Sequence, residues 1–286
     1  MLLKKKVILC ADDFGISPSV SKSICALAEK KRISATSVMV VYEDWNILCQ
    51  SLLEHKLYID IGLHLVLTEA RPLIPSKIIP SLTGESGDFF GMKQFMKRAW
   101  FGRIKSNEVY SELTAQYSKF VEYFGVEPDF IDGHHNVHQF PAVWNEIIRF
   151  VKNRGVENKI YIRNTAHRWT AALKKTDIFK TVLISIPGIM FKSRLLAGGL
   201  RTNESFGGVY SLTHSDNFEK RLKNFFILAG DKNAIIMTHP GQADSILAQR
   251  DPFCKGRELE EQVLLQEFFP KFLKEHNISL SKFEYM

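Results

Sequence analysis

Two adjacent carboxylates, Asp12 and Asp13, follow an apolar run near the start of the chain. This run, residues 7–11, has the composition of a buried strand. Neighbouring carboxylates repel each other, and burying either of them without a partner costs free energy. A bound cation would resolve the conflict, because it would hold one carboxylate as a ligand and leave the other to act as a base. The alternative is a turn before a helix, where aspartate is common for structural reasons alone.

Histidines are concentrated in two further segments. His64 lies in a strand-like run, residues 59–67, where a single histidine is often only part of the core. The segment 132–138 is denser, and its reactive members are Asp132, His134, His135 and His138. That density indicates a strand end that supplies metal ligands and the hydrogen bonds that support them. Two imidazoles and one carboxylate can hold a cation with positions left for water and substrate, which suits amide hydrolysis.

The elements that must position these residues alternate along the chain. Short β-branched and apolar runs predict strands at 7–11, 35–41, 59–65, 130–132, 160–163 and 234–238. A helix is expected from Pro18, with Ser17 as its N-cap. Amphipathic patterns predict further helices at 44–53, 108–124, 142–152, 217–228 and 257–274. This alternation predicts parallel βα units, and therefore a single α/β domain over residues 1–286.

Polar, potentially reactive side chains stand where the predicted strands end. They are Asp12, Asp13, His64, His134, His135, Arg163 and His239. In a parallel βα barrel the carboxyl ends of all strands open on one face, and active sites are assembled there. An open doubly wound sheet is the structural alternative, but it would bring fewer of these ends together.

Composition limits the class of protein. The chain has 286 residues, of which 45% are hydrophobic and 24% charged, as expected for a globular protein with a substantial core. We expect no signal peptide, and no run reaches the roughly 18 apolar residues that a membrane span needs. Four cysteines without CxxC spacing indicate reduced thiols in a cytoplasmic protein. The net charge is +7, but no nucleic-acid-binding motif accompanies it, so nucleic acid is not an expected partner.

Three segments together resemble a known family of enzymes. They are 11–15 (Ala-Asp-Asp-Phe-Gly), 62–64 (Gly-Leu-His) and 132–138 (Asp-Gly-His-His-Asn-Val-His). Their content and order resemble the YdjC-type carbohydrate deacetylases, the group of chitooligosaccharide deacetylase and the hopanoid-pathway deacetylase. Segments 202–208 and 238–241 also resemble later parts of that family. The resemblance implies a distorted TIM-like (β/α) barrel with one divalent metal ion, Zn²⁺ or Mg²⁺ among the candidates.

The resemblance also implies roles for individual residues. Asp13, His64 and His134 match the metal ligands of the family. Asp12 matches the general base that would take a proton from the attacking water. His239 is the candidate acid for the leaving amine, and its alternative role is to bind substrate.

Arg163 is expected either to stabilise the oxyanion or to orient Asp12. Four further residues are expected to bind substrate or to support the site: His138, His135, Asp132 and Asn203. One departure concerns the third segment, where Asn136 stands in place of the last of three consecutive histidines in the chitooligosaccharide enzyme. Because His134 is retained, this departure bears on the substrate more than on the metal.

Two mixed apolar and basic stretches bear on the substrate. One covers residues 178–200, where Pro187 and Gly188 are expected to break the segment, and the other covers residues 95–103. Either could meet a membrane surface, or it could simply pack on the barrel. Some proteins that resemble the family act on polyprenyl-phosphate-linked N-acetylhexosamines. We therefore expect a lipid-linked N-acetylated amino sugar, with peripheral association at the inner face of the membrane, and soluble chitooligosaccharides as the alternative.

Other functions compete with deacetylation. A metal-dependent hydrolase of phosphoester or glycosidic bonds is one, but a glycosidase needs two separated carboxylates that face the sugar. A sugar-binding barrel without activity is another, although binding alone does not require a base such as Asp12. The sequence leaves the oligomeric state open, with a homodimer as one option.

Overall fold

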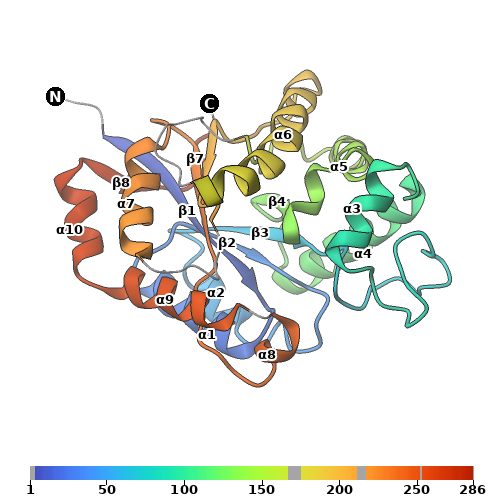
Figure 1. Ribbon diagram of the computed structural model, residues 1–286, viewed down its shortest axis with the longest axis horizontal. Coiled ribbons are helices and arrows are strands. Elements are labelled where there is room, and N and C mark those ends of the chain that lie inside the picture. The colour runs from blue at the N-terminus through green and yellow to red at the C-terminus, as the bar shows by residue number, and fades with distance from the viewer. Residues whose placement is uncertain (1–3, 167–174, 211–216, 252, 286) are drawn as a thin grey trace.

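The computed structural model describes residues 4–166, 175–210, 217–251 and 253–285, which form a curled parallel sheet with helices around it (Figure 1). In these residues the strand order is β5-β4-β3-β2-β1-β7-β6, and an eighth strand, β8, pairs with β1. All of these pairings are parallel. The strands are β1 (Lys5–Phe14), β2 (Ala35–Val38), β3 (Asp60–Leu65), β4 (Phe130–Gly133), β5 (Tyr161–Ile162), β6 (Ser205–Gly207), β7 (Ala234–Thr238) and β8 (Ile278–Leu280).

The sheet nearly closes into a barrel. Strands β1 to β5 are neighbours in chain order, and β6 and β7 return to the other side of β1. Ile162 at the end of β5 forms a parallel bridge to Thr202, three residues before β6. Its amide also donates to the carbonyl of Arg201 at 2.9 Å. The two ends of the sheet therefore meet through a short contact and not a full ladder, which confirms the expected distorted TIM-like barrel.

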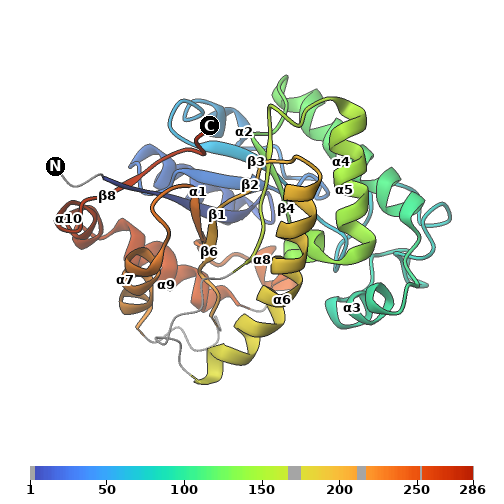
Figure 2. The same ribbon diagram turned by 90° about the horizontal axis from the view of Figure 1, so that it is seen from above.

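Helices cover the outside of this sheet, and Figure 2 shows them from above. They are α1 (Pro18–Glu29), α2 (Cys49–Leu53), α3 (Met92–Trp100), α4 (Ser106–Phe124), the 3₁₀ helix η1 (His134–Gln139), α5 (Pro141–Arg154), α6 (Lys175–Ala197), α7 (Phe218–Leu228), α8 (Leu247–Arg250), α9 (Cys254–Leu265) and α10 (Phe268–Glu275). The side chain of Ser17 accepts from the amide of Val20, so the predicted N-cap of α1 is confirmed.

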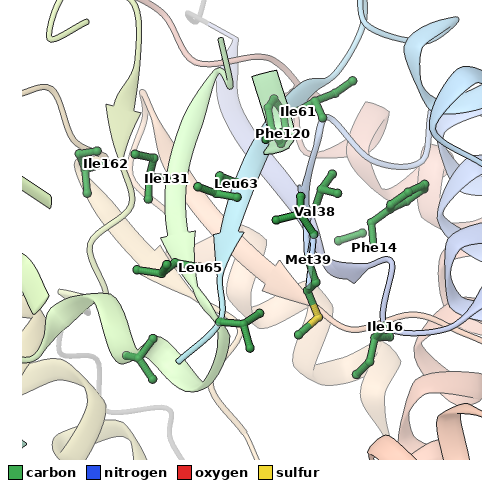
Figure 3. Close-up of a cluster of buried hydrophobic side chains, with 14 of the residues drawn as sticks. Phe14, Ile16, Val38, Met39, Ile61, Leu63, Leu65, Phe120, Ile131 and Ile162 are labelled. Carbon is green, nitrogen blue, oxygen red and sulfur yellow. The ribbon is translucent and has the colours of Figure 1, made fainter. Parts of the chain in front are cut away.

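Alternation along the strands divides the apolar side chains into two clusters. Val7, Leu9 and Ala11 of β1 belong to a large cluster between the sheet and its helices. Figure 3 shows members of that cluster on neighbouring strands. Ile8 and Cys10 belong to a smaller cluster that fills the inside of the barrel. Because the side chains of a strand alternate between its two faces, this split fixes which residue at each strand end faces inward.

Most predicted elements are confirmed within a few residues, and three differ. The helix predicted at 44–53 is shorter, because residues 43–48 form turns and α2 begins only at Cys49. The sequence predicts that Pro187 and Gly188 break the stretch 178–200, but α6 continues through both. The carbonyl of Ile184 accepts from the hydroxyl of Thr165 at 2.9 Å, so the loop after β5 packs against α6 close to the proline. The predicted helix 257–274 is two helices, α9 and α10, because the chain leaves helical geometry at Gln266 (ψ 149°).

Candidate metal centre and active site

The inward-facing residue at the end of each of five strands carries a polar group. Asp12 follows Ile8 and Cys10 on the inner face of β1, and the same alternation applies on the other strands. Their inward residues are His64 on β3, Asp132 on β4, and Arg163 and His239 directly after β5 and β7. The parallel barrel therefore gathers these groups at one rim, as the sequence predicts. A cavity of about 490 Å³ opens there, lined by Asp12, Asp13, His64, His134, His135, Arg163 and His239 among others.

A local irregularity turns Asp13 toward the same rim. The pairing of β1 with β2 shifts register between Ala11 and Phe14, which is a β-bulge. Asp13 itself has a φ of 70°, a left-handed conformation that is rare and costly for a residue other than glycine. On a regular strand Asp13 would face away from Asp12. The bulge lets two consecutive carboxylates reach one cavity.

Asp13, His64 and His134 form the candidate metal centre. Nε2 of His64 lies 3.1 Å and Nδ1 of His134 lies 3.2 Å from the same oxygen, Oδ1 of Asp13. The ligand atoms of the three residues all lie within 4.8 Å of one another. The sequence-based ligand set is therefore brought together. Two nitrogen donors and one carboxylate oxygen around an accessible cavity fit a divalent transition metal such as Zn²⁺.

The charges at this centre also fit a cation. Burial alone would raise the pKa of Asp13, but Arg257 and the two imidazoles outweigh it and hold that pKa well below its usual range. Burial would likewise lower the pKa of His64, yet Asp132 and Asp13 dominate and raise it to about 10. The imidazole thus retains a proton because carboxylates surround it. A divalent ion could replace that proton, as in metal sites generally.

Asp132 fixes the orientation of the His64 ring. Its Oδ1 lies 2.6 Å from Nδ1 of His64, and the hydroxyl of Ser37 lies 2.9 Å from the same nitrogen. When Nδ1–H donates to the carboxylate, Nε2 is left to face the metal centre. Carboxylate–histidine pairs of this kind support many metal sites. Asp132 is therefore placed to support the ring of His64, which is one of the two roles expected for it.

Asp12 is held by a guanidinium group. Nη1 and Nη2 of Arg163 donate to Oδ1 and Oδ2 of Asp12 at 2.7 and 2.8 Å, and all of these atoms are buried. Nη1 of Arg163 also lies 2.8 Å from Oδ2 of Asp132. The thiol of Cys10 and the hydroxyl of Ser37 are directed at Oδ1 of Asp12, 3.2 and 3.4 Å away. Because the guanidinium group of Arg163 already binds the carboxylates of Asp12 and Asp132, this geometry favours a role in orienting Asp12 over direct stabilisation of an oxyanion.

Helix α9 supplies two residues that the sequence reasoning missed. Nη2 of Arg257 donates to Oδ2 of Asp13 at 2.5 Å, and its Nε donates to Asp251 at 2.8 Å. Glu260, one turn later, accepts from the backbone amide of His239 at 2.5 Å and from the hydroxyl of Tyr210. In an amphipathic helix Arg and Glu are ordinary residues, so no motif distinguishes these two. Only their burial, at 1% and 0% exposed, would have indicated a role.

His239 lines the cavity and is neutral at pH 7. Burial lowers its pKa to about 4, although the nearby carboxylates of Asp13 and Asp12 oppose that shift. A neutral imidazole can accept a hydrogen bond or a proton, but it must gain a proton before it can act as an acid. Its backbone is fixed by Glu260, so the ring has a defined position at the rim.

The remaining predicted residues occupy different surroundings. His135 lines the cavity, and its Nδ1 lies 3.0 Å from the hydroxyl of Thr68. His138 is fully buried, and its Nε2 contacts the backbone carbonyl of Arg163 at 3.0 Å. Asn203 is also fully buried, and its side chain exchanges hydrogen bonds with the backbone of Asn164. His138 and Asn203 therefore support the β5 loop, and a direct contact with substrate stays a prediction for both.

The backbone of the third segment makes an unusual turn at His135 and Asn136. Asn136 has a φ of 57° and His135 a φ of 53°, so the chain makes two left-handed steps inside η1. Asparagine tolerates this conformation better than most residues. The turn presents His134 to the metal centre and sends His138 into the interior.

Comparison with known proteins identifies the family of this chain. A family model described as YdjC-like protein matches residues 6–275. The chain belongs to the YdjC family. Among its relatives, a carbohydrate deacetylase of Enterococcus faecalis is 25% identical over 283 residues, covering 98% of this chain and 97% of the relative. A chitooligosaccharide deacetylase of Proteus mirabilis is 28% identical over 280 residues, covering 97% of both chains.

A solved structure confirms the fold of this YdjC-family chain. It belongs to a protein of Enterococcus faecalis described as a candidate cellobiose-phosphate cleavage protein. The two structures superpose with a TM-score of 0.74 at 24% identity, and the match covers 98% of each chain. The likeness establishes a shared architecture, including the barrel.

Proposed function

We propose that this YdjC-family protein is a metal-dependent hydrolase that removes the N-acetyl group from an amino sugar. One observation carries the proposal. The candidate ligands Asp13, His64 and His134 converge in the same cavity as Asp12, a carboxylate held by Arg163. The relatives named above are carbohydrate and chitooligosaccharide deacetylases, so an acetamide on a sugar is the substrate group that fits.

A divalent ion bound by Asp13, His64 and His134 would polarise the acetamide carbonyl and lower the pKa of water. The donor set favours Zn²⁺ over Mg²⁺, which prefers oxygen ligands. Asp12 takes a proton from the water that attacks the carbonyl carbon. Its Oδ2 is suited to this, because among the described residues it accepts a hydrogen bond only from Arg163.

The proton must then reach the amine that leaves when the C–N bond breaks. His239 is neutral in the resting protein, so we assign it as a carrier that receives the proton from Asp12 and passes it to the amine. In this scheme the proton taken from water is the one that the amine receives, so no other acid is needed. The alternative is that Asp12 protonates the amine directly while His239 binds the sugar.

A second part of the proposal concerns which N-acetylated sugar is the substrate. We favour a polyprenyl-phosphate-linked N-acetylhexosamine that is reached at the inner face of the membrane, with a soluble chitooligosaccharide as the alternative. No helix in the described residues is both long and apolar enough to cross a membrane.

Acetate release from two substrates tests these proposals. Zinc-loaded protein is incubated with diacetylchitobiose and with a polyprenyl-phosphate-linked N-acetylhexosamine, and Asp12→Asn serves as the control. We expect release from at least one substrate and a loss of about 10²- to 10⁴-fold in the variant, because asparagine cannot take the proton. Zinc binding should persist, since Asp12 is not a proposed ligand. No acetate from either substrate, with zinc bound, would refute deacetylation of these sugars, and unequal rates would identify the substrate class.

A further inference from the structure

The excess of basic over acidic residues in this chain lies in two segments. Residues 89–107 and 178–203 together contain nine of the 38 lysines and arginines and none of the 31 aspartates and glutamates. The rest of the chain has 29 basic and 31 acidic residues, so it carries almost no net charge. The net charge of +7 therefore comes from these two segments, and an anionic partner would be attracted to them.

The fold brings the two segments to the same side of the cavity. The first contains α3 and the second most of α6. Trp100 of α3 contacts Phe140, and Phe191 of α6 stacks on Trp144, which lies one turn further along α5. Figure 2 shows α5 between the two helices.

Each of these helices also reaches the cavity. Met92, the first residue of α3, and Ile184 of α6 both belong to the cavity lining. The basic segments therefore flank the opening through which a substrate reaches Asp12 and the candidate metal ligands.

Large apolar side chains are exposed on the same two helices and at the residue that directly follows α3. They are Trp100, Phe101, Ile186, Ile189, Met190 and Leu196, and Phe101 is 70% exposed. The cations Lys93, Lys97, Arg103 and Arg194 are exposed beside them. We call these ten residues the α3–α6 surface. Apolar side chains interspersed with cations are typical of segments that enter a lipid headgroup region.

We propose that the α3–α6 surface docks this protein on an anionic membrane, with the cavity opening next to the lipid headgroups. A second copy of the chain would bring like charges together, which disfavours self-association through this surface. A nucleic acid would satisfy the cations but would leave most of the apolar side chains in water. An anionic membrane can contact the cations through its headgroups and the apolar side chains through its acyl chains. Its purpose rests on the proposed lipid-linked substrate, but membrane binding can be measured without any substrate.

Vesicle co-sedimentation of the full chain tests the docking surface. The probes are phosphatidylcholine vesicles with and without phosphatidylglycerol, at low and high salt, and a single-stranded oligonucleotide. One variant removes apolar groups, Phe101→Ser with Met190→Ser, and its control is Leu57→Ser with Ile227→Ser, which are 83% and 52% exposed elsewhere. A second variant neutralises Lys93, Lys97, Arg103 and Arg194 with glutamine. Its matched control neutralises Lys30, Lys220, Lys232 and Lys274, so both chains have a net charge of +3.

We expect salt-sensitive binding to the phosphatidylglycerol vesicles that falls at least about tenfold in both surface variants and stays within about twofold in both controls. Equal losses in the two charge variants would show that net charge alone acts, and this would overturn the proposal. Wild-type protein that stays in the supernatant with phosphatidylglycerol vesicles at low salt would also overturn the proposal. If the oligonucleotide binds more tightly than the vesicles, and if the Phe101→Ser, Met190→Ser variant binds it as the wild type does, the surface binds nucleic acid and not a membrane. Zinc binding and the thermal midpoint of every variant are measured alongside, so loss of docking is distinguished from loss of the site or of the fold.

Discussion

At the scale of single residues, the two oxygens of Asp13 have different partners. Its Oδ1 faces the imidazoles of His64 and His134, while its Oδ2 accepts from Arg257. Because Oδ2 is held by a guanidinium group, Asp13 is positioned to offer a metal a single oxygen. We therefore propose Arg257 as a positioning residue for the candidate metal centre.

Replacing Arg257 with glutamine tests this role. Asp13 and Asp251 would lose a buried partner, so the free energy of unfolding of the metal-free protein should fall by about 3–5 kcal/mol. Zinc affinity should fall about 10- to 100-fold, as for other residues that support metal ligands. Urea denaturation and calorimetric zinc titration measure the two effects. Arg257→Lys, which keeps the charge, should restore part of both. Unchanged zinc affinity in Arg257→Gln would show that Arg257 serves only the fold.

Glu260 gives the protein a pH dependence of stability. Burial raises its pKa to about 7, although Tyr210 and the amide of His239 oppose the shift. The unfolded chain should have the ordinary value of about 4.3, so the folded state binds the extra proton between these two pH values. The free energy of unfolding should therefore fall as the pH rises from about 4 to 7, by an amount of order 3 kcal/mol.

The Glu260→Gln variant removes the titrating group and serves as the reference. Chemical denaturation at pH 5 and pH 8 should show a smaller loss of stability in Glu260→Gln than in the wild type. An equal loss in both proteins would contradict the assigned pKa.

The residue scale also marks the limit of prediction from sequence. Asp12, Asp13, His64 and His134 could be predicted because each stands at a strand end or in an unusual cluster. Arg257 and Glu260 could not, since they lie on a helix more than 240 residues after Asp13 and follow an ordinary amphipathic pattern. Their roles depend on where α9 packs, which is a long-range property of the fold.

At the scale of elements, alternation along the strands explains why the polar groups converge. The pattern of apolar residues predicts the strands, and the inward direction of Asp12, His64 and Arg163 follows from it. The bulge at Asp13 does not follow, because nothing in the pattern indicates the register shift between Ala11 and Phe14. The helical course of α6 through Pro187 was also not predicted, because the expectation rested on the local effect of proline and did not include the contact of α6 with Thr165.

Gly62 on β3 tests the packing inside the barrel. A Cβ at this position would lie 2.5 Å from ring atoms of Phe130. That ring cannot withdraw easily, because it stacks on Tyr161, which stacks on Phe283. We expect Gly62→Ala to lower the free energy of unfolding by about 1–3 kcal/mol, as overpacked cores do.

Gly207 on β6 provides the matched control for that substitution. A Cβ there would meet its nearest neighbour, Ile236, at an ordinary 3.8 Å. Gly207→Ala should therefore change stability by less than about 1 kcal/mol. Urea denaturation of the two variants compares them directly. Equal stabilities would mean that the inside of the barrel is less tightly filled than the contacts indicate.

At the scale of the whole molecule, a sequentially wound barrel concentrates function at one rim. In the part of the chain that the structure describes, its sheet closes through the short contact of Ile162 with Arg201 and Thr202, and the cavity opens at the ends of its strands. The order of βα units predicts this architecture. The surfaces around the opening are less predictable, since α3 and α6 flank the cavity only after the barrel has formed.

A metal titration of acetate release tests the central claim most directly. Metal-free protein receives Zn²⁺ in steps, and acetate released from the preferred N-acetylated sugar is measured at each step. We predict negligible release without metal, a rise to a plateau at about one equivalent, and no rise in a His64→Ala variant over the same range. Full release from the metal-free protein would contradict the account, and so would an unchanged titration in His64→Ala.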